Sequence, residues 1–167
     1  MKAVILAAGL GTRLGNGIPK PLTMLTDDKS ILGFQIDKLQ SIIGLHNIIV
    51  VVGYEFQSIM KEFPQLTYVY NHQYATHNCA KSLLLGLQKI HNEDVIFLDG
   101  DVYFDDGVLS LLLNDNCSAA LVKIRDCEDE EPYTGTCKLE LPIIAAKPTD
   151  CPVFGDGTKC NWVEVIP

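Results

Sequence analysis

Glycines and two cations cluster near the start of the chain. Residues 6–14 read LAAGLGTRL, and residues 19–22 read PKPL. Glycines let a ligand approach the backbone closely, and successive amide N–H groups in such a loop can surround phosphate oxygens. Arg13 offers a planar donor fork for a phosphate, and Lys20 is held between two prolines that stiffen the chain. This combination suits a triphosphate and a departing pyrophosphate.

The loop alone leaves phosphate binding open. Glycine-rich turns after strands also occur without ligands, and an isolated arginine is commonly a solvated surface charge. The loop has neither the GK[ST] ending of a Walker A motif nor the GxGxxG dinucleotide pattern.

A second group of charged residues, Asp99-Gly100-Asp101, follows the apolar run DVIFL at residues 94–98. Carboxylates at the end of a buried strand are suited to Mg²⁺, which prefers a few oxygen ligands together with water and substrate phosphates. The alternative is a simple Asp-Gly turn.

Apolar runs alternate with helical patterns along most of the chain. We expect strands at residues 2–7, 47–53, 66–70, 94–98 and 118–124, and helices after Ser30, at 55–63, after Asn78 and at 107–113. This alternation predicts an α/β fold, a three-layer sandwich with a mostly parallel, Rossmann-like sheet. Right-handed crossovers then bring the loops after the strands to one edge, where ligands bind.

The pattern fails after Arg125. Residues 126–132 are acidic, and beyond them only a strand at 162–166 is suggested. We expect residues 1–125 to form a nucleotide-binding core and residues 126–167 an atypical C-terminal part of the same domain.

Composition excludes several classes of partner. The net charge of −8 argues against nucleic acid, and no apolar run approaches the roughly 20 residues that span a bilayer. The apolar stretch near Met1 is too short for a signal peptide, so we expect a cytoplasmic protein. The six cysteines form no CxxC pair, so we expect free thiols rather than a metal knuckle.

The string LAAGLGTRL followed by PKPL resembles the signature of the sugar-phosphate nucleotidyltransferase superfamily. The resemblance implies a fold of the nucleotide-diphospho-sugar transferase type. It also implies nucleotide binding by Leu6, Ala7, Ala8, Gly9, Gly11, Thr12, Arg13 and Lys20. LDGDVYF resembles the superfamily's metal-binding motif, which makes Asp101 the Mg²⁺ ligand and leaves Asp99 behind it or facing away.

Residues 71–83 resemble the N-x-x-[YFW]-x-x-x-N-x-x-x-S-L pattern of the phosphocholine and inositol-phosphate cytidylyltransferase group. The resemblance implies that Asn78 and Ser82 help to build the nucleotide and acceptor pocket. Asn78 could equally cap the following helix, and both roles are compatible. Tyr54 is expected either to line the base pocket or to pack. His72 and His77 are expected on the surface.

The implied activity is a Mg²⁺-dependent nucleotidyltransferase, cytidylyltransferase-like. It would join a nucleoside triphosphate, CTP favoured, to a phosphorylated small alcohol or sugar 1-phosphate and release pyrophosphate. Because the acceptor phosphate is already anionic, no general base is needed. The expected catalytic residues Arg13, Lys20 and Asp101 would act by positioning and charge neutralisation.

The later part of the chain departs from the superfamily pattern. Members continue further, often with a W-x-E-I-D string that supplies a second metal carboxylate, whereas here Trp162-Val163-Glu164-Val165 lacks the Asp. Glu164 is a weaker candidate ligand. The alternative function is therefore a catalytically impaired nucleotide-binding or regulatory module. A molybdopterin-type nucleotidyltransferase shares the LAAG start, but PKPL and the Asn78/Ser82 motif argue against it. The sequence leaves the base, the acceptor and the oligomeric state open.

Overall fold

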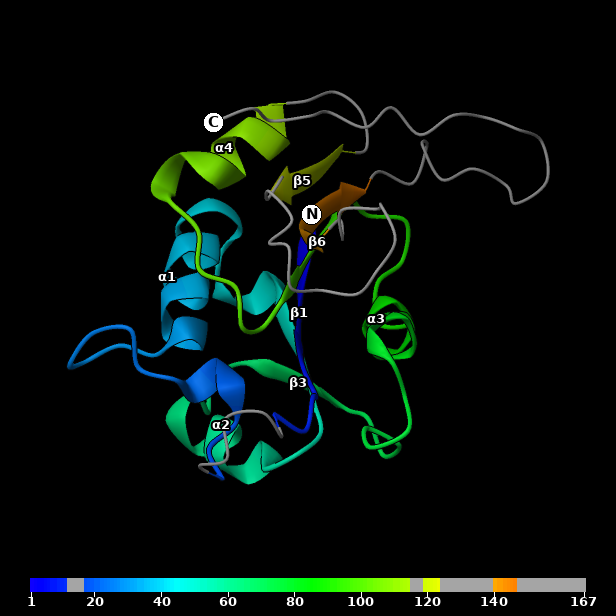
Figure 1. Ribbon diagram of the computed structural model, residues 1–167. Helices are drawn as coiled ribbons and strands as arrows, with labels where there is room; N and C mark the ends of the chain where they lie inside the picture. The colour runs from blue at the N-terminus through cyan, green and yellow to red at the C-terminus, as the bar shows by residue number, and fades with distance from the viewer. Residues whose placement is uncertain (12–16, 115–118, 124–139, 147–167) are drawn as a thin grey trace, which may run out of the picture.

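The computed structural model describes residues 1–11, 17–114, 119–123 and 140–146 (Figure 1). Its described strands form one sheet in the order β3-β2-β1-β4-β6-β5. They are β1 (Lys2–Ala7), β2 (Ile48–Val52), β3 (Thr67–Tyr70), β4 (Val95–Asp99), β5 (Ala119–Lys123) and β6 (Glu140–Ala146). The five strands expected from the sequence are all present, within one or two residues of their predicted ends.

The first four strands form the parallel half of the sheet. β1 pairs in parallel with β2 and β4, and β2 pairs in parallel with β3. Every residue of β2 is buried, as expected for an apolar run covered on both faces. The register places Ala7 opposite Val52 and Leu6 opposite Asp99. The loops that follow β1, β2 and β4 therefore meet at the same edge.

β6 is the strand that the sequence did not predict. It pairs antiparallel with both β4 and β5 and separates them in the sheet. Its sequence, ELPIIAA, is a short apolar run interrupted by a proline. Such a run gives no alternating pattern. The strand suggested at 162–166 lies outside the described residues.

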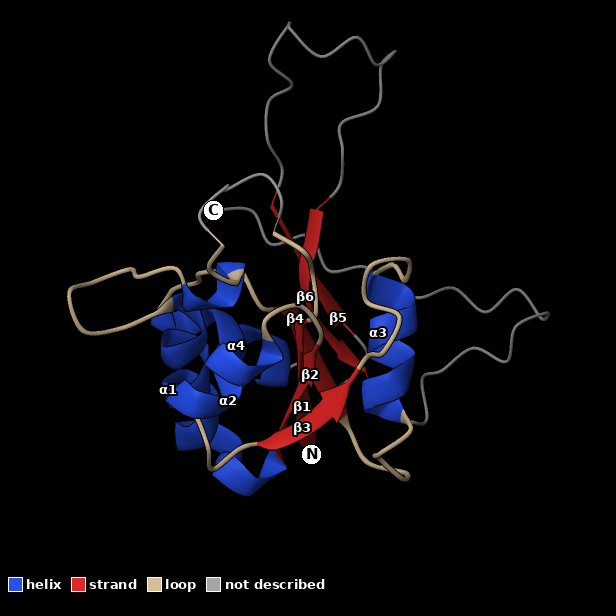
Figure 2. Ribbon diagram, turned by 90° about the horizontal axis from the view of Figure 1, so that it is seen from below, coloured by secondary structure: helices blue, strands red, loops and turns tan. Residues whose placement is uncertain are grey.

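Four helices of the described chain cover the sheet on two sides (Figure 2). α1 (Ile31–Ile43), α2 (Phe56–Glu62) and α4 (Asp106–Asn114) lie on one face, and α3 (Cys79–Leu87) lies on the other. Side chains alternate along β1 accordingly. Ala3, Ile5 and Ala7 join the core beneath α1, whereas Val4 packs on the side of α3. The predicted three-layer α/β sandwich is confirmed.

The helix starts agree with the predicted caps. Ser30 accepts a hydrogen bond from the backbone N–H of Gly33 (3.3 Å) and donates one to Glu62 (2.9 Å), which ties α1 to α2. α1 ends at Gly44, whose φ of 79° favours glycine. None of the helices in the described ranges is long and apolar enough to cross a bilayer.

Candidate functional site

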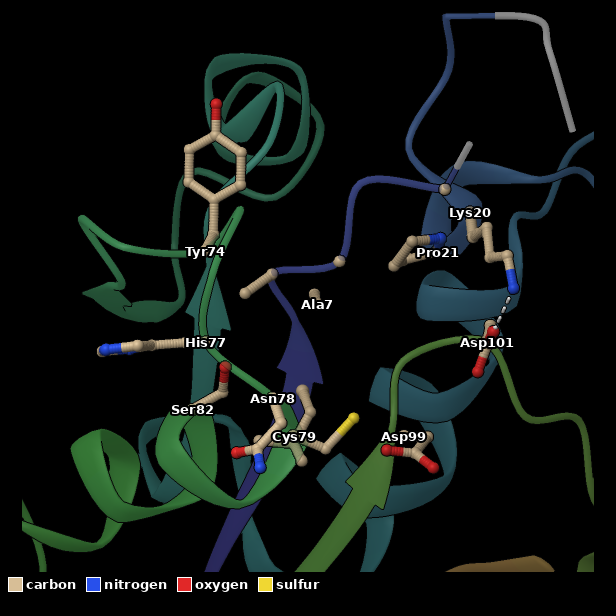
Figure 3. A pocket seen from close by; sticks show the side chains of 14 residues that line it. Ala7, Lys20, Pro21, Tyr74, His77, Asn78, Cys79, Ser82, Asp99 and Asp101 are labelled. Carbon is tan, nitrogen blue, oxygen red and sulfur yellow. Dashed lines mark hydrogen bonds and ion pairs between the residues drawn. The ribbon is translucent and has the colours of Figure 1, made fainter. Parts of the chain in front are cut away.

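A cleft opens at the carboxyl edge of the parallel strands (Figure 3). It lies between the loop after β1, the short 3₁₀ helix η2 (Lys20–Leu22), the turn after β4, and the start of α3 with the segment before it. The lining residues are Leu6, Ala7, Ala8, Gly9, Gly11, Lys20, Pro21, Tyr74, His77, Asn78, Cys79, Ser82, Asp99 and Asp101. Segments up to 95 positions apart in the sequence thus share one site.

The loop after β1 presents its backbone to the cleft. A methyl group built on Gly9 would meet no atom of the described residues within 4 Å, so they leave space on that side of the loop. Gly11 has a φ of 61°, a conformation that favours glycine. The structure places Leu6, Ala7, Ala8, Gly9 and Gly11 in the cleft, as the sequence predicts. Their role in nucleotide binding stays a prediction.

Lys20 and Asp101 form an ion pair at the cleft, with Nζ and Oδ2 3.0 Å apart (Figure 3). Both side chains are partly exposed, at 34% and 41%. Pro19 is the N-cap residue before η2, and the buried Pro21 follows Lys20, so the backbone at this lysine is restricted on both sides. Two residues that the sequence assigned to separate motifs therefore lie together, with a cation and a carboxylate available to a charged ligand.

The turn carrying Asp101 packs tightly on the end of β1. A Cβ on Gly100 would lie 2.8 Å from the carbonyl oxygen of Leu6 and 3.1 Å from Pro21 Cγ. The Gly100 N–H donates to that same Leu6 oxygen at 2.9 Å. Only glycine fits here without displacing backbone, which explains the residue before Asp101.

Polar groups from the segment before α3 line the other side of the cleft. Asn71 is buried and donates to Ser82 Oγ at 3.0 Å, so the Ser82 hydroxyl can still donate its own hydrogen. Asn78 Oδ1 accepts from the Lys81 N–H at 3.1 Å and caps α3. Asn78 also lines the cleft, so one residue both caps α3 and can face a ligand.

The structure distinguishes the two alternatives for Tyr54 and favours packing. Tyr54 lies outside the lining residues and packs beside Tyr74, with ring centroids 6.4 Å apart. Tyr74 and not Tyr54 faces the cleft. The available signal was that Tyr74 is the aromatic position of the motif at 71–83. His72 is exposed, as predicted, whereas His77 is half-buried and lines the cleft, which corrects its expected surface position.

Cys79 is a lining residue that the sequence did not single out. Partial burial raises the pKa of its thiol, and the carboxylates of Asp99 and Asp101 raise it further. The thiol is therefore protonated at neutral pH and is a poor nucleophile.

Three predicted site residues, Thr12, Arg13 and Glu164, lie outside the described part of the chain. Their roles stay predictions. Within the described ranges no group of three or more His, Cys, Asp or Glu side chains could hold a metal alone. Asp99 and Asp101 nevertheless line one cleft. One or two carboxylates, completed by water and substrate phosphates, are the ligand set that Mg²⁺ commonly takes, so these residues fit the ion.

Residues 3–143 match a known family, the MobA-like NTP transferase domain. The chain belongs to this family. It is 40% identical over 108 residues to choline-phosphate cytidylyltransferase of Streptococcus pneumoniae, covering 62% of this chain and 45% of that protein. It is 34% identical over 121 residues to CMP-5'-(3-aminopropyl)phosphonate synthase of Streptomyces rubellomurinus, covering 67% of this chain and 19% of that protein. The chain thus spans less than half the length of either relative.

Solved structures of other nucleotidyltransferases share the fold of this chain. The inositol-1-phosphate CTP transferase of T. maritima superposes with a TM-score of 0.65 at 15% identity, covering 89% of this chain and 71% of that one. CTP:phosphocholine cytidylyltransferase of Streptococcus pneumoniae gives a TM-score of 0.60 at 23% identity with the same coverage. The predicted nucleotide-diphospho-sugar transferase fold and the suspected family group are confirmed.

Proposed function

We propose that this NTP transferase domain joins a nucleoside triphosphate, CTP favoured, to a phosphorylated small alcohol or sugar 1-phosphate and releases pyrophosphate. The observation that carries the proposal is the meeting of an open glycine loop, Lys20 and Asp101 in one cleft at the sheet edge. Anions bind where backbone N–H groups and a fixed cation converge.

The reaction needs two anions to meet. An oxygen of the acceptor phosphate forms a bond to the α-phosphorus, the bond from that phosphorus to the bridging oxygen of the β-phosphate breaks, and pyrophosphate leaves. The acceptor is ionised at neutral pH, so no residue has to remove a proton. Lys20 would neutralise charge at the α-phosphate and the acceptor phosphate, and Arg13 would do so at the departing pyrophosphate.

Other residues would position the nucleotide. The backbone of residues 7–11 would hold phosphates, and the Ser82 hydroxyl and Asn78 amide would contact the base or ribose. Asp101, with Asp99 beside it, would hold Mg²⁺, which supplies charge neutralisation when bound.

CTP is favoured for two reasons. The motif at residues 71–83 resembles that of cytidylyltransferases, and the relatives named above include a cytidylyltransferase, a CTP transferase and a synthase of a CMP compound. An acceptor carrying a phosphate or phosphonate is common to those names.

The test is pyrophosphate release with Mg²⁺ across the four ribonucleoside triphosphates and a panel of phosphocholine, inositol phosphate and sugar 1-phosphates. We expect release with one triphosphate and one acceptor. Asp101→Ala should abolish it, and Lys20→Met should lower kcat/KM by about 10²–10³-fold, the usual cost of losing one charge-stabilising group. Asp27→Ala and Lys61→Met, on exposed residues that do not line the cleft, are the matched controls.

Triphosphate binding without pyrophosphate release from any acceptor would contradict the proposed transfer. It would instead support the alternative, a nucleotide-binding module. Release that survives Asp101→Ala would remove Asp101 from the mechanism.

A further inference from the structure

Gln35 is a buried polar side chain in the middle of α1. It is 1% exposed and lies in the same helix as the core residues Leu32, Ile36 and Leu39. Burying an amide costs stability unless its polar atoms find partners. The position of this amide therefore needs a reason beyond packing.

The reason lies in the turn after β4. Gln35 Nε2 donates to the carbonyl oxygens of Asp99 (2.8 Å) and Val102 (2.7 Å). These two carbonyls flank Gly100 and Asp101. The turn's own hydrogen bond, from Val102 N–H to the Asp99 oxygen, is long at 3.4 Å. The two bonds from Gln35 are thus the shorter contacts that close this turn.

The orientation of the amide is fixed by its neighbours. If the amide were flipped, Oε1 would face two carbonyl oxygens, all three of them acceptors. Nε2 must therefore face the turn. Oε1 is buried and has no hydrogen-bond partner within the described part of the chain. Nε2 donates both of its hydrogens to the turn, while Oε1 lacks a hydrogen bond within the described residues. The contacts of this side chain therefore stabilise the turn rather than the core.

We infer that Gln35 is a positioning residue that fixes the Asp99–Val102 turn and thereby the Asp101 carboxylate in the cleft. The effect of Gln35 on metal binding and catalysis rests on the proposed function, in which Asp101 holds Mg²⁺. Gln35 does not line the cleft, so it acts through the turn. The contacts of Gly100 with Leu6 and Pro21 hold the turn against β1 and η2, and Gln35 holds the same turn from α1.

The first test needs neither nucleotide nor turnover. Amide hydrogen exchange is measured by NMR in the wild type, Gln35→Met and the matched control Gln40→Met, which changes an exposed glutamine of the same helix. In Gln35→Met the amides of Gly100 and Val102 should exchange about tenfold faster, as expected for the loss of one or two hydrogen bonds. Amides of β2 should change much less. Gln35→Leu is a second variant in case the methionine does not pack.

The second test measures Mn²⁺ affinity in the presence of CTP by electron paramagnetic resonance. Gln35→Met should weaken Mn²⁺ binding about 10-fold or more, in the range seen when residues supporting a metal ligand are removed. Gln40→Met should not. In an Asp101→Asn background, Gln35→Met should add no further loss, because its effect passes through that carboxylate.

Exchange in the turn that is unchanged, or that rises uniformly with β2, would overturn the inference and leave Gln35 with a general structural role. Mn²⁺ affinity that falls equally in both Asp101 backgrounds would also overturn it. If the wild type neither binds Mn²⁺ with CTP nor releases pyrophosphate, the proposed function fails, and the exchange measurement alone decides whether Gln35 fixes the turn.

Discussion

Gly9 and Gly53 lie near the same residue, Ala8, but their surroundings are opposite. A Cβ on Gly53 would lie 2.4 Å from Tyr74 Cβ and 2.7 Å from the Ala8 carbonyl oxygen, whereas a Cβ on Gly9 would project into open space. Gly53 is therefore required by packing, because it lets Tyr74 lie against the strand ends. Gly9 has no such neighbour in the described part of the chain, so packing there does not require a glycine, whereas a ligand close to its backbone would.

We therefore expect Gly9→Ala to fold normally but to bind CTP more weakly. The loss should be about 1–3 kcal/mol, the usual cost of forcing a methyl group into filled space. Calorimetric titration measures the affinity, and thermal unfolding measures stability. Gly53→Ala is the contrasting variant, because it should lower the unfolding temperature. Unchanged affinity in Gly9→Ala would mean that the triphosphate does not approach this loop.

Tyr68 gives a prediction about pH. Burial raises its pKa to about 12, and Glu62 contributes further. Its hydroxyl donates to the Phe63 carbonyl oxygen at 2.7 Å. In the unfolded chain the pKa is about 10. The folded state therefore holds the proton more tightly, so this contribution to stability is complete below pH 10 and is lost as pH rises toward 12.

Urea unfolding between pH 8 and 11.5 measures this effect. The free energy of unfolding of the wild type should fall more steeply above pH 10 than that of Tyr68→Phe. Tyr103→Phe, which changes an exposed tyrosine, should follow the wild type. Parallel curves for wild type and Tyr68→Phe would show that folding does not raise the pKa of Tyr68.

The sequence predicts those site residues whose positions are set by the ends of the parallel strands. Lys20 and Asp101 follow β1 and β4, and parallel neighbours bring such residues to one edge. Tyr74 could have been chosen over Tyr54 from its aromatic position in the motif at 71–83, but the room that Gly53 leaves for it comes from packing, which the motif does not show. No sequence pattern indicated the role of Gln35, because its partners are main-chain carbonyls, which every residue has and no sequence motif identifies.

At the scale of elements, α3 packs tightly against the sheet at Gly86. A Cβ there would lie 2.6 Å from Val4 Cγ1 and 3.1 Å from Val51 Cγ2. α3 carries Asn78 at its start and Ser82 in its first turns, so the depth at which this helix packs also sets the position of two cleft residues.

Gly86→Ala should therefore destabilise the protein. Overpacking costs about 1–3 kcal/mol, and the better helix propensity of alanine offsets about 1 kcal/mol of it. Gly107→Ala in α4 is the matched control, because a Cβ there meets nothing within 4 Å among the residues that the structure describes. The control should be neutral or more stable by up to about 1 kcal/mol. Urea unfolding compares the two. A Gly86→Ala protein more stable than wild type would mean that α3 moves outward at little cost.

Strands and helices were predictable where burial or capping requires particular residue types. β1 and β2 are continuous apolar runs because both of their faces are covered, and the helices carry recognisable caps at Ser30 and Asn78. β6 joins the sheet antiparallel and needs no crossover helix to introduce it. Its short apolar run, interrupted by Pro142, therefore did not predict a strand.

At the scale of the whole molecule, β6 joins two parts of the sheet. It pairs with β4 on one side and β5 on the other, and within the described strands β5 pairs with β6 alone. The expected boundary near residue 125 would separate β6 from the strands that it joins. Residues 140–146 therefore belong to the same sheet as the strands that precede residue 125.

A chain of residues 1–125 should consequently fold poorly. Loss of β6 exposes the edge of β4 and leaves β5 without its partner, and exposed apolar edges pair with other chains. Size-exclusion chromatography should show aggregation, and thermal unfolding should lose its cooperative transition. A chain of residues 1–146, which keeps every described strand, is the matched control. A monomeric 1–125 chain with an unchanged unfolding temperature would show that residues 1–125 fold independently.

The strand order also has a consequence in time, during synthesis. β5 leaves the ribosome before β6, yet the place beside β4 belongs to β6. The parallel strands β1 to β4 can assemble while the edge at Val95–Asp99 stays open. At about 5–20 residues per second, the 23 residues from 124 to 146 take about 1–5 s to be made. For that interval β4 of the nascent chain lacks its neighbour, so its open edge can pair with other chains until β6 completes the sheet.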